Sequence, residues 1–150
     1  MADDVTRPPA RLRALVSWQV SKVNTVGSRL TSARMPLTGR ADFAVLAALE
    51  EYGTLSQAEL GRRLGLDRND VNGVVNRLQG GGHLTRDVDL ADRRRNTLSL
   101  TDAGRRYLDD LQTSTDAVQA ELVAALTPDE GAQLRALLTK LLESHPVVPS

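Results

Sequence analysis

Residues 56–82 read SQAELGRRLGLDRNDVNGVVNRLQGGG, and residues 83–101 continue HLTRDVDLADRRRNTLSLT. The first stretch opens with Ser56 and Glu59, which have the spacing of a capping box. In a capping box each side chain binds the backbone amide of the other residue, so a helix begins there. Gly65 is the kind of residue that ends a helix. The pattern therefore predicts a short helix between Ser56 and Gly65.

Asp67 is placed to cap a second helix, in which apolar residues recur at i, i+3, i+4 and i+7: Val71, Val74, Val75 and Leu78. Two short helices joined by a tight turn that contains glycine form a helix-turn-helix. The polar side of the second helix carries Arg68, Asn69, Asn72, Asn76 and Arg77. Asn and Arg can make bidentate contacts to adenine and guanine in the major groove of DNA. These five residues are candidate base contacts, although any amphipathic helix also has a solvated polar side.

Ser56 and Gln57, at the start of the preceding helix, are further candidate DNA contacts. After the second helix, residues 83–88 and 96–100 alternate apolar and polar positions as strands do. The tip between them holds the next group of candidates: Asp92, Arg93, Arg94 and Arg95. Arginines at such a tip can enter a narrow minor groove, where the negative potential is concentrated. Helix, helix and basic hairpin in this order predict a winged helix-turn-helix that binds double-stranded DNA.

The charge distribution agrees with this interpretation. The 150 residues carry 19 basic and 19 acidic side chains, so the formal net charge is zero and attraction to DNA must be local. From Thr54 to Arg106 there are ten Arg, no Lys and seven acidic residues, which gives this segment a net charge of +3. Arginine has a planar fork of donors suited to phosphates and guanine edges, whereas lysine is a point charge. A solvated, arginine-rich surface without a DNA partner remains the other interpretation.

Apolar helices are predicted on both sides of this segment. A first helix with apolar residues from Leu12 to Leu30 ends near Met35, and Thr38 is the expected N-cap of the next helix. Thr101 begins a long helix, and the Thr127–Glu130 capping box begins a last one. The first and last helices have little else in the chain to cover their apolar faces. This favours a dimer over a single chain that buries both faces. The candidate dimer contacts are Leu12, Leu15, Val16, Leu134, Leu137, Leu138 and Leu141.

Taken together, these motifs resemble the MarR (multiple antibiotic resistance regulator) family. The resemblance rests on residues 56–60, 66–68, 74–78, 92–94 and 100–104, together with Gly82 and Arg86. It implies one mostly α-helical domain over residues 1–150 with a small β-hairpin wing. In it, dimerisation helices over 5–35 and 102–145 flank a winged helix-turn-helix DNA-binding lobe over 38–101. It further implies a homodimer on a pseudo-palindromic operator, usually a repressor, which a small aromatic or acidic ligand releases.

The ligand pockets of the family lie between the dimer helices and the DNA-binding lobe, so Trp18, Phe43 and Tyr107 are candidate pocket residues. Each of the three is equally typical of ordinary core or surface. Asp70 and the zero net charge favour an alternative function slightly. In it, the winged-helix dimer is a ligand-binding or protein-interaction module with weak or no DNA binding.

Other classes of protein find no support. The chain lacks cysteine, which excludes disulfides, thiolate zinc sites and thiol-based redox switches. His83 and His145 belong to no metal-spaced cluster, and Gly80–Gly82 follows a helix and not the strand that a phosphate-binding loop requires. We therefore expect no enzyme, metal or cofactor. No signal peptide or membrane-spanning apolar run is visible, so we also expect a cytoplasmic protein with no membrane partner.

Overall fold

The structure is a computed structural model that describes residues 6–92 and 95–145. Its elements in chain order are α1 (Ala10–Arg13), α2 (Val16–Arg34), α3 (Gly39–Tyr52), β1 (Leu55–Ser56), α4 (Gln57–Leu64), α5 (Arg68–Gly80), β2 (Leu84–Val88), β3 (Asn96–Leu100), α6 (Asp102–Leu122) and α7 (Pro128–Ser144). The predicted fold class, mostly helical with a β wing, is confirmed.

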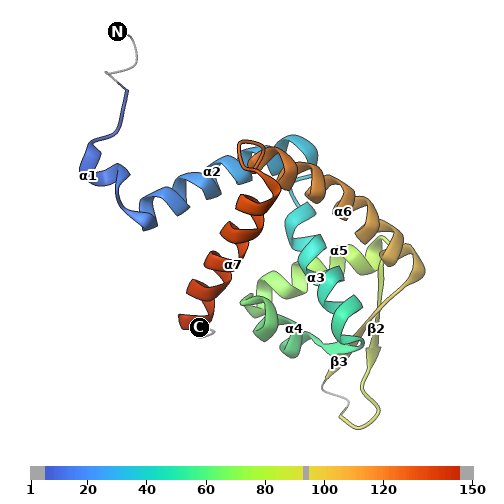
Figure 1. Ribbon diagram of the computed structural model, residues 1–150. Helices are drawn as coiled ribbons and strands as arrows, with labels where there is room; N and C mark the ends of the chain where they lie inside the picture. The colour runs from blue at the N-terminus through green and yellow to red at the C-terminus, as the bar shows by residue number, and fades with distance from the viewer. Residues whose placement is uncertain (1–5, 93–94, 146–150) are drawn as a thin grey trace.

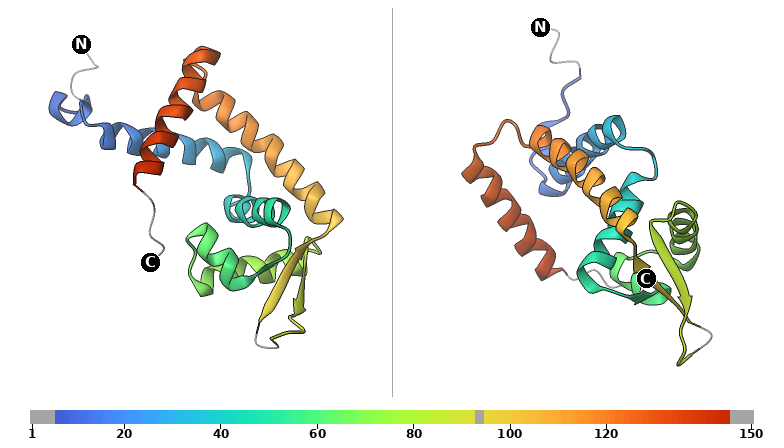
Figure 2. Two further views of the ribbon diagram at one scale, coloured as in Figure 1. Left: turned by 60° about the horizontal axis from the view of Figure 1, so that its bottom comes forward. Right: turned by 90° about the vertical axis from the view of Figure 1, so that its right-hand side faces the viewer.

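The elements from α3 to β3 form a central lobe, and the other helices extend from it (Figure 1). Helix α6 packs against both α3 and α2, so it joins the lobe to the N-terminal helices. Helix α7 turns back after α6 and stands away from the lobe in the right-hand view of Figure 2. Among the described residues, no helix is long and apolar enough to cross a membrane.

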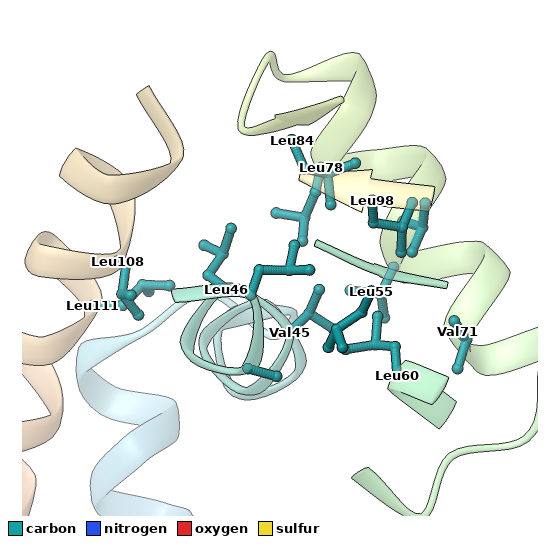
Figure 3. Close-up of a cluster of buried hydrophobic side chains, with 14 of the residues drawn as sticks. Val45, Leu46, Leu55, Leu60, Val71, Leu78, Leu84, Leu98, Leu108 and Leu111 are labelled. Carbon is teal, nitrogen blue, oxygen red and sulfur yellow. The ribbon is translucent and has the colours of Figure 1, made fainter. Parts of the chain in front are cut away.

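The core of the lobe is built from the helical stripe and the strand alternation that the sequence predicts (Figure 3). All four residues of the predicted stripe on α5 are buried: Val71, Val74, Val75 and Leu78. They meet the apolar side of α3, which includes Val45 and Leu46, and the inward-facing Leu84 and Leu98 of the sheet. Leu108 and Leu111 of α6 complete the cluster. One continuous core therefore fixes α5 and the hairpin to α3 and α6.

The predicted helix starts are largely confirmed. Both capping boxes are present, at Ser56–Glu59 and at Thr127–Glu130. The Asp67 side chain accepts from the Asp70 amide at 2.8 Å. Helix α3 does begin after Thr38, but the hydroxyl of Thr38 makes no capping bond because this residue already has helical backbone angles. A capping side chain needs an extended backbone at its own position, so that part of the prediction is wrong.

Two further features differ from the prediction. The expected continuous first helix is broken into α1 and α2, because Leu15 is extended and the Gln19 side chain binds the free carbonyl of Arg13 at 2.8 Å. The expected hairpin is a three-stranded antiparallel sheet in the order β1-β3-β2. Its third strand pairs Leu55 with Leu98. Two residues are too short a strand to show an alternating pattern, so the sequence does not reveal it.

The start of α6 is held against the turn between α5 and β2. The Thr101 hydroxyl donates to the Gly82 carbonyl at 2.7 Å and accepts from the Gly104 amide at 3.0 Å. A Cβ atom on Gly104 would lie 2.0 Å from the carbonyl oxygen of His83. Glycine at position 104 is therefore a steric requirement, and it lets α6 approach the turn at backbone distance.

Replacing Gly104 with alanine is expected to lower the free energy of unfolding by about 3 kcal/mol, because the backbone has to shift to make room. Gly73→Ala is the matched control, since a Cβ at position 73 meets nothing within 4 Å. On helix propensity it should raise the stability by about 1 kcal/mol. Urea unfolding of both variants at one fixed protein concentration measures the difference. Equal midpoints for Gly104→Ala and the unmodified chain would contradict the steric argument.

Candidate nucleic-acid interface

The polar side of α5 faces away from the core. Its five candidate residues are all exposed: Arg68, Asn69, Asn72, Asn76 and Arg77. Because α5 contacts β2, the helix and the hairpin lie side by side (Figure 1). Within the described residues, Arg68, Asn69 and Asn72 make no side-chain hydrogen bond or ion pair, so these three are available to a partner. Asn76 and Arg77 have partners within the chain.

Asn76 is held by an arginine from the hairpin. The guanidinium of Arg86, on β2, donates to the Asn76 side-chain oxygen at 2.8 Å, and the Nε of Arg86 is buried with no hydrogen-bond partner among the described residues. Arg86 is absent from the residues that the sequence singles out as DNA contacts. Alternation along β2 from the buried Leu84 places Arg86 on the same face, toward α5, and this signal identifies it. The contact ties the polar side of α5 to the wing.

Arg77 reaches across to α3, although its side chain is 40% exposed. Its guanidinium forms an ion pair with the carboxylate of Asp42 on α3, and Asp42 is 2% exposed. The Tyr107 hydroxyl, from α6, donates to the other oxygen of that carboxylate at 2.8 Å. Burial, and then the hydrogen bond and negative charge of Asp42, raise the pKa of Tyr107 to about 12. The ring of His83 lies 4.5 Å from that of Tyr107. Sequence inspection misses Asp42, since nothing local marks a buried carboxylate.

The side chain of Ser56 caps the start of α4. Ser56 is buried and its hydroxyl accepts from the Glu59 amide, while Gln57 is half-buried. The amide and hydroxyl of Ser56 lower the pKa of Glu59, and the charges of Arg95 and Arg62 act in the same direction. Arg95 of the wing reaches Glu59 at 3.8 Å. The structure therefore gives Ser56 a capping role and connects the wing to α4.

Backbone hydrogen bonds join the described residues on either side of the wing tip. The amide of Arg95 donates to the Asp92 carbonyl and the amide of Asp89 donates to the Arg95 carbonyl, each at 2.9 Å. Asp92 and Arg95 are both exposed. Arg93 and Arg94, the other two candidates at this tip, lie outside the described residues.

A groove runs between α2, α3 and α6. Two adjoining hollows of about 270 Å³ and 170 Å³ share Thr31, Arg40 and Gln119, and Phe43 lines the smaller one. Of the three aromatic candidates, only Phe43 lines either hollow. Trp18 lies under the Lys22 ammonium on α2, and Tyr107 binds Asp42. The described residues include no group of three or more His, Asp or Glu side chains that could hold a metal ion.

All seven candidate dimer residues are exposed in the single chain, by 36% to 62%: Leu12, Leu15, Val16, Leu134, Leu137, Leu138 and Leu141. Nearby apolar residues on α2, including Val20 and Val23, are exposed as well. The chain by itself therefore leaves the apolar sides of α1, α2 and α7 in water.

Comparison with known proteins places this arrangement in a family. The model of the MarR family matches residues 36–95. The HTH-type transcriptional regulator YkoM of Bacillus subtilis is 36% identical over 99 residues, which are 66% of this chain and 64% of that protein. The chain spans less than two thirds of the length of the curated relatives that it matches first, which are named as HTH-type transcriptional regulators or repressors.

Solved structures extend the likeness over the whole fold. A probable transcriptional regulator from Pseudomonas aeruginosa is 30% identical with a TM-score of 0.74, over 87% of this chain and 98% of that one. BpsR of Bordetella bronchiseptica, whose DNA binding is regulated by 6-hydroxynicotinic acid, is 25% identical with a TM-score of 0.73, over 84% and 97%. A cysteine-to-serine mutant of MarR from E. coli, complexed with operator DNA, is 25% identical with a TM-score of 0.71, over 85% and 93%. The chain belongs to the MarR family of winged helix-turn-helix transcriptional regulators.

Proposed function

We propose that this protein is a dimeric, sequence-specific DNA-binding regulator of transcription, in which α5 reads the major groove and the wing contacts the DNA beside it. One observation carries the proposal: α5 presents Arg68, Asn69 and Asn72, which are exposed and have no partner among the described residues, outside a buried apolar stripe that fixes the helix to the core. Side chains of these types, on a helix held rigidly from behind, are suited to base edges. The E. coli MarR mutant that shares this fold was crystallised with operator DNA.

The wing residues Asp92, Arg93, Arg94 and Arg95 take part through the backbone and the minor groove. Arg95 is exposed beside the wing tip, next to the strand that holds Arg86 against α5. Arginines in this position neutralise phosphates, and their contribution depends on salt. The same surface without DNA affinity is the alternative function, a dimeric ligand-binding or protein-interaction module.

Arg68→Ala and Asn72→Ala are each expected to weaken binding to the preferred sequence by about 1–3 kcal/mol and to relax the preference at one base pair. The preferred sequence is first selected from a random duplex library with the unmodified protein. Anisotropy titrations with that duplex and its single-base variants, at two salt concentrations, then measure the effect.

Replacing all three wing arginines with alanine should make the slope of log affinity against log salt concentration less steep, by about 0.9 for each phosphate that is no longer neutralised.

Arg29→Ala is the matched control, since it removes one exposed positive charge from α2, outside the lobe. It should leave the base preference unchanged. If Arg68→Ala behaves like Arg29→Ala, α5 does not read bases through Arg68. If the unmodified protein selects no duplex even at low salt, the alternative function holds.

We propose further that the exposed apolar sides of α1, α2 and α7 pack against a second copy of the chain. The seven candidate dimer residues are among the large apolar side chains that remain in water in one copy, and two of the helices that carry them lie at opposite ends of the sequence. A twofold dimer buries these side chains in both copies and places two α5 helices about one DNA turn apart. The lobe keeps its own core in either state.

Leu141→Glu is expected to raise the dimer dissociation constant more than about 100-fold, because each interface would bury two unpaired carboxylates. Sedimentation at micromolar protein concentration measures the molecular mass. Ala136→Glu adds the same charge to α7, about 140° around the helix from Leu141, and should leave the mass unchanged. A monomeric unmodified protein would contradict the proposed interface.

The groove between α2, α3 and α6 is the proposed ligand site. Arg40 is the charged side chain that lines both hollows, and Phe43 and Met35 supply apolar surface in the smaller one. A guanidinium beside an aromatic ring suits a small aromatic carboxylate. BpsR, which shares the fold, is regulated by such an acid.

Benzoate and 6-hydroxynicotinate at millimolar concentration are expected to raise the Tm, whereas benzamide should not, because only the acids carry a charge for Arg40. Arg40→Met should abolish the increase, and Arg29→Met should preserve it. Differential scanning fluorimetry makes the comparison. The same increase in Arg40→Met as in the unmodified protein would place the acid elsewhere.

A further inference from the structure

Asp42 is the one buried acidic residue among those that the structure describes, and its carboxylate requires bonding partners from neighbouring residues. It lies in the first turn of α3, and its side chain is 4% exposed. A buried carboxylate is tolerated only when charged or hydrogen-bonding partners replace the water that it has given up. The residues that pair with Asp42 are therefore held in place by their bonds to this carboxylate as well as by their own packing.

Those partners come from two other helices. One carboxylate oxygen accepts from the Nη2 of Arg77, on α5, and the other accepts from the hydroxyl of Tyr107, on α6, at 2.8 Å. The partners lie 35 and 65 residues along the chain. The Tyr107 ring also contacts the ring of His83. The backbone carbonyl of His83 accepts a hydrogen bond from the Thr101 amide at 3.3 Å. One side chain therefore joins α3, α5 and α6 to the turn that leads into the wing.

These polar contacts fix the rotation of α5 about its own axis, which apolar packing alone leaves partly free. Apolar contact is non-directional, so the valine stripe decides which side of α5 faces the core and tolerates small rotations about the helix axis. A charge-assisted hydrogen bond is short and directional. Arg77 lies nine residues from Arg68, about 14 Å along the helix. The bond to Asp42 therefore sets the rotation at which Arg68, Asn69 and Asn72 are presented.

We propose that Asp42 is a positioning residue for DNA recognition, which aims α5 by holding Arg77, and that Arg77 reads no base. The proposal rests on the DNA-binding function proposed above. It reassigns Arg77, which the sequence pattern groups with the base contacts. For Arg77 to reach DNA, its ion pair with Asp42 has to break, and Tyr107 is then the one remaining partner of the two that this buried carboxylate binds.

Asp42→Asn separates this role from simple electrostatics. The change makes the chain more positive by one charge, so a protein without the positioning contact should bind DNA slightly more tightly. An amide is neutral and has one acceptor oxygen, so it loses the charge-assisted bond to Arg77 and can no longer accept from Arg77 and Tyr107 through separate oxygens. We expect affinity for the selected duplex to fall about tenfold or more, with the order of base preferences preserved. Asp102→Asn, an exposed acid in the first turn of α6, is the charge-matched control.

Arg77→Met should weaken binding equally at every single-base variant and leave the salt slope unchanged, since no phosphate or base contact is removed. The double variant Asp42→Asn with Arg77→Met should bind about as well as the weaker single variant, because both changes remove one contact. Arg68→Ala, in contrast, changes the preference at one base pair. Anisotropy titrations with the selected duplex and its variants measure all of these proteins.

Tyr107→Phe keeps every charge and removes one hydrogen bond from the same carboxylate, so it decides the matter if Asp42→Asn does not fold. We expect a folded protein by circular dichroism with binding about fivefold weaker. Unchanged or tighter binding in folded Asp42→Asn, or unchanged binding in Tyr107→Phe, overturns the proposal. A change at one base pair or a lower salt slope in Arg77→Met also overturns it. An unmodified protein that selects no duplex removes the DNA-binding function itself, which is a different result from a bound duplex with insensitive variants.

Discussion

The burial of one side of α3 is the constraint on which the rest of the lobe depends. Val45 and Leu46 are completely buried, and Leu49 is nearly so. Helix α3 contacts α4, α5, α6 and β3, which surround it (Figures 1 and 3). Each of those elements is amphipathic, and the shortest of them have no independent stability, so they form only where α3 covers their apolar sides. The outward direction of α5 follows from this, because its buried stripe has to meet α3.

Directional polar contacts then refine an arrangement that apolar packing has selected. Arg86 binds Asn76 across the join between wing and helix, and Arg95 reaches Glu59 on α4. The Asp42 carboxylate binds donors from two helices. Such contacts add modest stability at the surface, yet they fix relative orientation where a ligand has to match a spacing of a few ångströms. The arginines of this protein therefore divide into those that hold the surface together and those, such as Arg68, that face outward from it.

Local features of the chain were predictable, and distant ones were not. The capping boxes, the valine stripe and the alternation of the two wing strands depend on residues within a few positions of one another, and each matches the structure. Strand β1 pairs across more than forty residues, and Arg77 meets Asp42 across 35. Nothing near Asp42 in the sequence distinguishes it from a solvated acid at a helix start. The break before α2 depends on a side chain satisfying a free carbonyl, which periodicity does not report. The groove and the role of Arg40 likewise required the relative placement of three helices.

The contact at Gly104 has a mechanical consequence. Because α6 meets the backbone of the wing turn with no side chain between them, the first turn of α6 and the lobe move as one rigid body. Helix α6 has 21 residues, which makes it a lever about 30 Å long. A tilt of about 5° at its far end, beside α2, displaces the lobe by about 3 Å. A molecule bound between α2, α3 and α6 would therefore act on α6 far from this joint, where a small tilt of the helix would also move the wing.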